Sequence, residues 1–85
     1  MPVFLYPFGM DDVERVLTKK VAEEIRRLRR AADLSQEDFA AQCGVHRTYM
    51  GAIERAEKTM TIETAKKVVN SLGLSLGEFF QQIGE

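Results

Sequence analysis

Apolar residues recur at intervals of three and four along most of the chain, a pattern typical of helices with one buried face. The first such stretch follows Asp11, which forms a capping-box pattern with Glu14 three residues later. This predicts a long helix over about residues 12–32, with a break near Thr18 as an alternative. The apolar positions of that helix are Val13, Val16, Leu17, Val21, Ile25 and Leu28.

Four shorter helices are predicted after it. Ser35 and Thr61 are good N-cap residues, and Gly44 can adopt the left-handed backbone that ends a helix. These signals place a second helix over about 36–43, a third over 46–55, a fourth after Thr61 and a fifth in "LGEFFQQI". The fourth helix has its apolar face at Ile62, Ala65, Val68, Val69 and Leu72. No stretch alternates as a strand would, so the predicted fold class is all-α with five helices.

The second and third predicted helices are joined tightly enough to form a helix-turn-helix. Ala40 is small where the two helices would cross, and Gly44 follows at the turn. Met50 and Ile53 are apolar where the third helix would pack on the core. This combined spacing favours a helix-turn-helix over two unrelated helices.

The third helix carries side chains suited to DNA bases. If it lies in a major groove, its first residues face the base edges. Arg47 can donate two hydrogen bonds to guanine, and Thr48 can hydrogen-bond a base or contact a thymine methyl group. Gly51 and Ala52 follow one turn later, where small residues would allow close approach to the bases. The alternative is an exposed helix face with no partner.

Other residues around this helix suit phosphates. His46 and Tyr49 flank the base-facing stripe, although His46 could equally be a solvated N-cap residue. Ser35 and Gln36 begin the second helix, where free backbone N–H groups can bind a phosphate. The predicted interface therefore combines base contacts with backbone contacts.

The run "LSQEDFAAQCGVHRTYMGAIERAEKTMTIETAKKVVNSLGLSLGEFF" resembles the XRE, or Cro/CI-type, family of helix-turn-helix regulators. Within it, "GVHRTYMGAIER" is similar to the controller proteins of restriction–modification systems. The resemblance implies a five-helix, repressor-like DNA-binding domain over residues 18–85. Residues 1–17 have no counterpart in the minimal family domain and form an N-terminal extension.

The resemblance also implies roles for single residues. It makes Arg47 and Thr48 the main base contacts, and it gives Gln36 both a phosphate contact and a contact that braces the third helix. Arg29 and Glu54 match a buried ion pair between the first and third helices. The loop residues implied to contact the DNA backbone are Arg55, Lys58 and Thr59. The residues implied to form a homodimer interface are Leu74, Leu76, Phe79, Phe80 and Ile83.

Two features depart from the family pattern. The family usually has glycine after "ER", where this chain has Ala56, so the third helix is expected to continue and shift the following loop. Phe79 and Phe80 are adjacent and cannot both point inward, so one is expected in the core and the other on a dimer surface.

The charge of the chain gives mixed support to DNA binding. The chain has 85 residues, which suits one compact domain, and its net charge of −1 with a pI of about 5.8 counts against a simple basic nucleic-acid binder. However, residues 15–30 hold seven basic side chains against Glu23 and Glu24. A dipolar surface can still present a positive face to phosphates, although such a run is often only a solvated helix face.

The remaining chemistry excludes several classes. Cys43 is the single cysteine and there is one histidine, so no disulfide or zinc site is expected, and no metal or cofactor is predicted. No apolar run approaches the roughly 20 residues that span a membrane. The segment "MPVFLYPFGM" lacks the features of a signal peptide. We expect a reduced, cytoplasmic protein in which Cys43 is a small buried apolar residue.

The sequence thus predicts a regulator that binds double-stranded DNA as a homodimer on a palindromic operator. The alternative is a protein-interaction module, such as an antitoxin, which keeps the fold without reading bases. The acidic pI and the unusual N-terminus, with its aromatics Phe4, Tyr6 and Phe8, favour that alternative slightly, whereas Arg47, Thr48 and Lys58 count against it. These aromatics could pack on the domain, extend a dimer contact or be mobile. An enzyme is not expected, because no set of acid–base groups converges, and no small-molecule ligand is evident.

Overall fold

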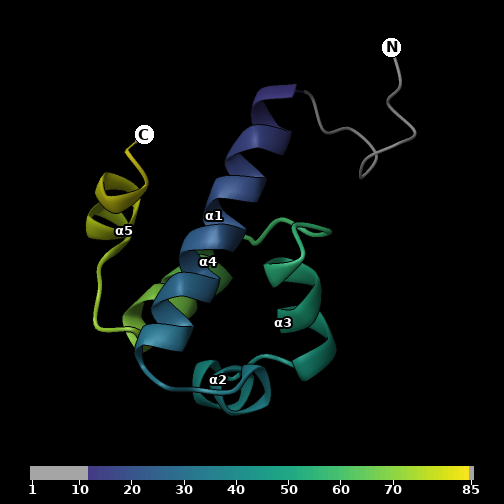
Figure 1. Cartoon of the computed structure of the whole chain (residues 1–85), viewed down its shortest axis with the longest axis vertical. Coiled ribbons are helices and arrows are strands. Elements are labelled where there is room, and N and C mark those ends of the chain that lie inside the picture. The colour runs from purple at the N-terminus through teal and green to yellow at the C-terminus, as the bar shows by residue number, and fades with distance from the viewer. Residues whose placement is uncertain (1–11, 85) are drawn as a thin grey trace.

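The computed structural model describes residues 12–84 of the chain, so Asp11 and the N-terminal aromatics lie outside the described residues. The described part contains five helices and no strand (Figure 1). The helices are α1 (Asp12–Ala31), α2 (Gln36–Cys43), α3 (Arg47–Glu54), α4 (Ile62–Ser71) and α5 (Leu76–Ile83). This confirms the predicted all-α fold class and the order of its elements.

Local capping explains where the short helices begin. The Ser35 hydroxyl accepts a hydrogen bond from the Asp38 N–H at 3.0 Å, and Thr61 caps α4 in the same way through the Thr64 N–H at 3.1 Å. At the start of α5, Ser75 and Glu78 form a complete capping box, with distances of 3.1 and 2.9 Å. Each cap satisfies backbone N–H groups that have no partner inside the helix. The cap residues are local in sequence, which is why the starts were predictable.

Glycine and one alanine end the helices of the helix-turn-helix. Gly44 has φ of +74° and ends α2, as expected. The expectation that Ala56 would let α3 continue was wrong, because α3 ends at Glu54 and Ala56 itself has φ of +61°. The N–H groups of Ala56 and Glu57 bond to the carbonyls of Ile53 and Ala52 at 3.1 and 2.9 Å, closing the helix end. Ala56 therefore adopts the left-handed conformation that glycine usually takes at such a C-terminus.

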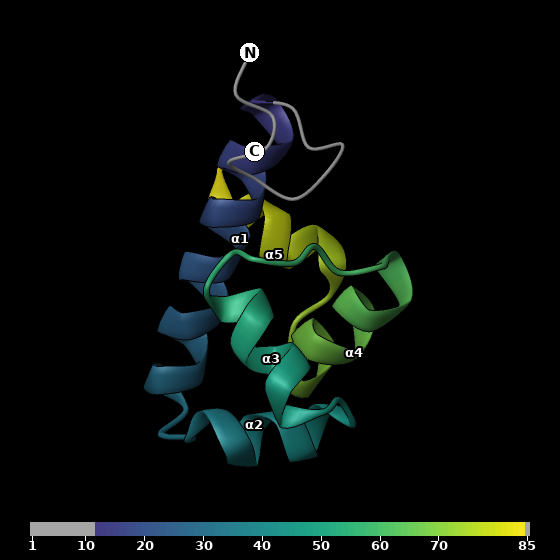
Figure 2. The same cartoon turned by 90° about the vertical axis from the view of Figure 1, so that its right-hand side faces the viewer.

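One hydrophobic core lies between the five helices. In Figure 2, α3 crosses between α1 and α4, with α2 beneath it. Contacts join α2 to α3 and α4, α1 to α3 and α5, and α4 to α5. The core residues are Ile25, Phe39, Ala40, Cys43, Met50, Ile53, Val68, Val69 and Phe79. Ile62 was expected on the apolar face of α4, but its 75% exposure places it outside the core, at the first position of the helix.

The described residues also bear on the domain boundary, on a membrane span and on a metal site. α1 is continuous from Asp12 to Ala31, so the proposed division between residues 17 and 18 falls inside this helix. None of the helices in the described part is long and apolar enough to cross a membrane. Within residues 12–84, no group of three histidine, cysteine or acidic side chains is placed to hold a metal ion.

Candidate nucleic-acid interface

α3 is held with its first turn facing solvent. His46 precedes the helix, and its Nδ1 accepts a hydrogen bond from the Thr48 N–H at 3.1 Å. Met50 and Ile53 are buried on the inner face of α3 and fix its rotation about its own axis. Arg47 and Thr48 are both exposed as a result. The two residues expected to contact bases therefore lie side by side at the exposed start of the helix.

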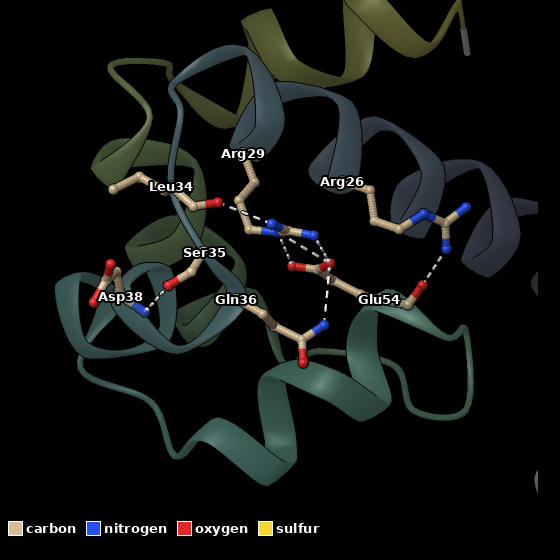
Figure 3. A network of polar contacts seen from close by, with 7 residues as sticks. All are labelled: Arg26, Arg29, Leu34, Ser35, Gln36, Asp38 and Glu54. Atoms are coloured by element: carbon tan, nitrogen blue, oxygen red, sulfur yellow. Dashed lines mark hydrogen bonds and ion pairs between the residues drawn. The ribbon is translucent and has the colours of Figure 1, made fainter.

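A buried ion pair ties α1 to α3. Glu54 is only 1% exposed, and Arg29 Nε and Nη2 donate to its two carboxylate oxygens at 2.9 and 3.0 Å (Figure 3). Arg29 Nη1 also donates to the Leu34 carbonyl at 2.9 Å, and the Arg26 guanidinium donates to the Glu54 carbonyl. A buried carboxylate requires such partners, because its desolvation is costly. The expected pair is present, and it fixes the end of α3 against α1.

Gln36 joins α2 to this network. Its Nε2 donates to Glu54 Oε1 at 3.3 Å, which is the expected brace to α3 (Figure 3). The Gln36 Oε1 atom lies close to Gly51 of α3. The Ser35 hydroxyl is engaged by the Asp38 N–H, so Ser35 acts as a cap in the free chain. Phosphate contacts from Ser35 and Gln36 stay predictions.

Arg47 has a carboxylate beside it in the free chain. Its Nη1 lies 3.4 Å from Glu37 Oε2, and both side chains are about two-thirds exposed or more, at 67% and 73%. An exposed pair at this distance is weak, because water competes for both groups. Arg47 can therefore exchange Glu37 for another acceptor at little cost.

Gly51 and Ala52 were expected to allow the bases to approach α3 closely, but neither residue is exposed in the structure. Both are buried, Ala52 being 8% exposed. A Cβ atom at Gly51 would lie 2.9 Å from Arg55 Nη1 and 3.2 Å from Gln36 Oε1, so two side chains cover this glycine. In the free chain, the surface one turn beyond Arg47 is formed by the Arg55 guanidinium. Sequence reasoning missed this placement, although the four-residue spacing of Arg47, Gly51 and Arg55 is a signal for it.

The loop after α3 is held by two polar contacts. Arg55 Nε and Nη2 donate to the Glu57 carboxylate oxygens at 3.0 and 3.1 Å. These hydrogen bonds hold the pKa of Glu57 below its usual value. The Tyr49 hydroxyl donates to the Thr59 carbonyl at 3.4 Å, while Lys58 and Thr59 are exposed. The loop thus presents Arg55, Lys58 and Thr59 after the C-terminal end of α3, with Glu57 among them.

The residues expected at a dimer interface are not equally available. Phe79 is 1% exposed and belongs to the core of the chain itself, whereas Phe80 is 42% exposed and meets the Phe79 ring edge-to-face at 5.5 Å. Leu74, Leu76 and Ile83 are half-buried against the core. The available apolar surface of α5 therefore centres on Phe80.

An apolar groove of about 460 Å³ adjoins Phe80. It lies between α1, the α3–α4 loop, α4 and α5, and its walls include Leu17, Val21, Met60 and Ile62.

Cys43 lies elsewhere, in the core, where burial raises the pKa of its thiol and keeps it protonated. A buried, protonated thiol does not suit redox sensing.

Comparisons with known proteins agree with this geometry. The helix-turn-helix family HTH_3 matches residues 25–79. Control protein C.MunI of Mycoplasma sp is 35% identical over 65 residues, covering 75% of this chain and 88% of the relative. Control protein C.SmaI of Serratia marcescens is 34% identical over 73 residues, covering 86% and 82%.

A solved structure of a controller protein is also similar to this chain. The restriction-modification controller protein C.Esp1396I, solved as a tetramer in complex with its natural 35 base-pair operator, is 31% identical to this chain. The two structures superpose with a TM-score of 0.73 over 79% of this chain and 88% of the other.

Proposed function

Because the chain belongs to the HTH_3 helix-turn-helix family, we propose that it is a sequence-specific transcriptional regulator that binds double-stranded DNA as a homodimer on a palindromic operator. The observation that carries the proposal is the exposed Arg47–Thr48 pair at the start of α3, a helix whose other face is anchored in the core. The relatives named as control proteins support the same class of function.

In the proposed complex, residues 46–55 lie in the major groove. Arg47 would leave Glu37 and donate two hydrogen bonds to a guanine, and Thr48 would contact the neighbouring base. The buried pair of Arg29 and Glu54 would keep α3 at a fixed angle during this exchange. Rigid support matters, because base recognition requires hydrogen-bond geometry accurate to a few tenths of an ångström.

Phosphate contacts would position the domain on the duplex. The start of α2, at Ser35 and Gln36, offers backbone N–H groups to one phosphate. The exposed residues Arg55, Lys58 and Thr59 would contact the backbone on the other side of α3. His46 and Tyr49 flank the same surface. These contacts would set orientation and register, whereas Arg47 and Thr48 would determine the sequence preference.

A second copy would complete the operator contact. One α3 covers only a half-site, and two copies about 34 Å apart would reach two half-sites on the same face of the duplex. We propose that the copies meet through α5, with Phe80 at the centre and Leu74, Leu76 and Ile83 around it. The exposed part of Phe80 beside the apolar groove supports this choice.

Selection from a random duplex library tests the proposal. The purified protein would be used at about 0.15 M salt, with an Arg47→Ala, Thr48→Ala protein as the matched control. We expect the unaltered protein to enrich an inverted repeat whose half-sites lie one helical turn apart, and the control to lose this enrichment. A failure to enrich any sequence would contradict base recognition and would support a partner-binding module that keeps the fold.

A further inference from the structure

We propose that Glu57 lowers the affinity of the protein for all duplex DNA by competing with phosphate for the Arg55 guanidinium. This inference rests on the proposed DNA-binding function and adds a residue that sets its strength. It begins from the bidentate contact in the free chain, where two guanidinium nitrogens donate to two carboxylate oxygens at 3.0 and 3.1 Å. A phosphate would use the same donors in the same geometry.

The turn at Ala56 brings Glu57 to Arg55. Ala56 has φ of +61°, and this left-handed residue reverses the chain directly after α3. The Glu57 N–H then bonds to the Ala52 carbonyl at 2.9 Å, which fixes the Glu57 backbone against the helix end. Its carboxylate reaches a guanidinium only two residues away. The backbone conformation at Ala56 therefore favours the ion pair between Arg55 and Glu57.

Gly51 determines where the paired guanidinium lies. Since glycine has no Cβ, Arg55 Nη1 can occupy the space over α3, 2.9 Å from the position that a Cβ would take. Gln36 Oε1 borders the same space. Arg47, Gly51 and Arg55 are four residues apart in turn, so the guanidinium lies on the stripe of α3 that begins with Arg47. Glu57 thus holds a cation on the surface proposed to meet DNA.

Exposure makes the exchange with phosphate feasible. The side chains of Arg55 and Glu57 are 58% and 57% exposed, so DNA can reach the guanidinium without unfolding the loop. When phosphate replaces Glu57, the released carboxylate stays close to the negatively charged backbone. Both effects weaken binding, and neither depends on the base sequence. Glu57 should therefore change affinity for specific and random duplexes by a similar factor.

The variant Glu57→Gln tests the proposal, since it keeps the size of the side chain and removes its charge. Binding to a fluorescent random-sequence duplex and to the selected operator would be measured by anisotropy across a salt series. We expect both affinities to rise about two- to fivefold, the range for releasing an exposed ion pair. We also expect the slope of log K against log salt to change by less than about 0.9, the value for one phosphate contact, because Arg55 contacts the phosphate in both proteins.

Two matched variants separate this mechanism from a general charge effect. Glu23→Gln makes the same change of charge at an exposed site on the α5 side of α1, where Glu23 lies near Gln82 and Ile83. It should raise affinity much less than Glu57→Gln. In an Arg55→Gln background, Glu57→Gln should give a clearly smaller gain, because the guanidinium for which it competes is gone and only the repulsion between its carboxylate and the DNA backbone is relieved.

The outcomes distinguish this inference from the proposed function. Equal gains from Glu57→Gln and Glu23→Gln would overturn the competition, as would a full gain in the Arg55→Gln background. The DNA-binding function would stand in both cases. If neither the unaltered protein nor Glu57→Gln binds any duplex at low salt, the proposed function fails and this inference fails with it.

Discussion

At the scale of single residues, the proposed recognition of bases depends most on Arg47. Its guanidinium is exposed, and its contact with Glu37 is long enough to be given up easily. The backbone that carries it is much less free, because the His46 cap and the buried Met50 fix the first turn of α3. An exposed guanidinium group on a firmly anchored helix suits a side chain that must form hydrogen bonds with one base edge.

We predict that Arg47→Ala weakens binding to the selected operator by about 1–3 kcal/mol and relaxes the preference at one position in each half-site. The physical reason is the loss of two hydrogen bonds to one guanine. Competition between the operator and its single-base variants would measure both effects. An equal loss on every duplex would show instead that Arg47 contacts a phosphate.

The buried pair of Arg29 and Glu54 acts on the same helix from inside the protein. We predict that Arg29→Met lowers the free energy of unfolding by about 3–5 kcal/mol, because Glu54 would be left buried without its main partner. Urea unfolding followed by circular dichroism would measure this. The double variant Arg29→Met, Glu54→Leu should recover much of the loss, since no unpaired charge is then buried.

Arg27 provides the control for that prediction. It is also an arginine of α1 paired with a glutamate, Glu24 at 2.6 Å, but its side chain is 60% exposed. Arg27→Met should shift the urea midpoint far less than Arg29→Met. If the two variants were equally destabilised, burial of the Arg29–Glu54 pair would not be the cause.

At the scale of elements, the end of α3 stores backbone strain. Ala56 holds a left-handed conformation that costs an L-residue roughly 1–2 kcal/mol, and it does so because two backbone hydrogen bonds close the helix there. We predict that Ala56→Gly stabilises the domain by about 0.5–1 kcal/mol, after the greater freedom of glycine in the unfolded chain is included. Urea unfolding again gives the measurement.

The same substitution inside a helix should act in the opposite direction. Ala41 is exposed on α2, and Ala41→Gly should destabilise the domain by about 1 kcal/mol, the ordinary helix-propensity difference. If Ala56→Gly were destabilising by a similar amount, strain at Ala56 could not be the explanation for its unusual φ angle.

At the scale of the whole molecule, the two ends of the fold have different surfaces. The start of α3 is polar, with the exposed Arg47 beside the Glu37 carboxylate. The α5 side carries Phe80 and the apolar groove, which Lys58 and Thr59 of the α3–α4 loop also line. A dimer formed through α5 would therefore leave both copies of α3 free to meet DNA.

We predict that Phe80→Glu converts the proposed dimer into a monomer, because the substitution would place two like charges in a desolvated apolar contact. Sedimentation velocity would measure the mass. Val16→Glu is the matched control, since Val16 is an exposed apolar residue of α1. Dimers of unchanged stability in the Phe80→Glu protein would exclude α5 as the interface.

The sequence by itself determined the five helices, their order and most of their ends. It did so because those features depend on neighbours a few residues away: the caps at Ser35 and Thr61, the left-handed Gly44, and apolar positions spaced by three and four. The Arg29–Glu54 pair was also accessible, but only through the resemblance to a known family, since 25 residues separate its members.

Only the tertiary structure decided how much of each predicted face is covered. The periodicity of apolar residues shows which residues share a helix face, whereas their burial depends on packing against elements that are distant in the sequence. Gly51 is covered because the side chains of Gln36 in α2 and of Arg55 after α3 both lie over it, and Ile62 is exposed because the first position of α4 extends beyond the core. The choice between Phe79 and Phe80 and the left-handed Ala56 were settled in the same way, by packing and hydrogen bonds that no local pattern contains.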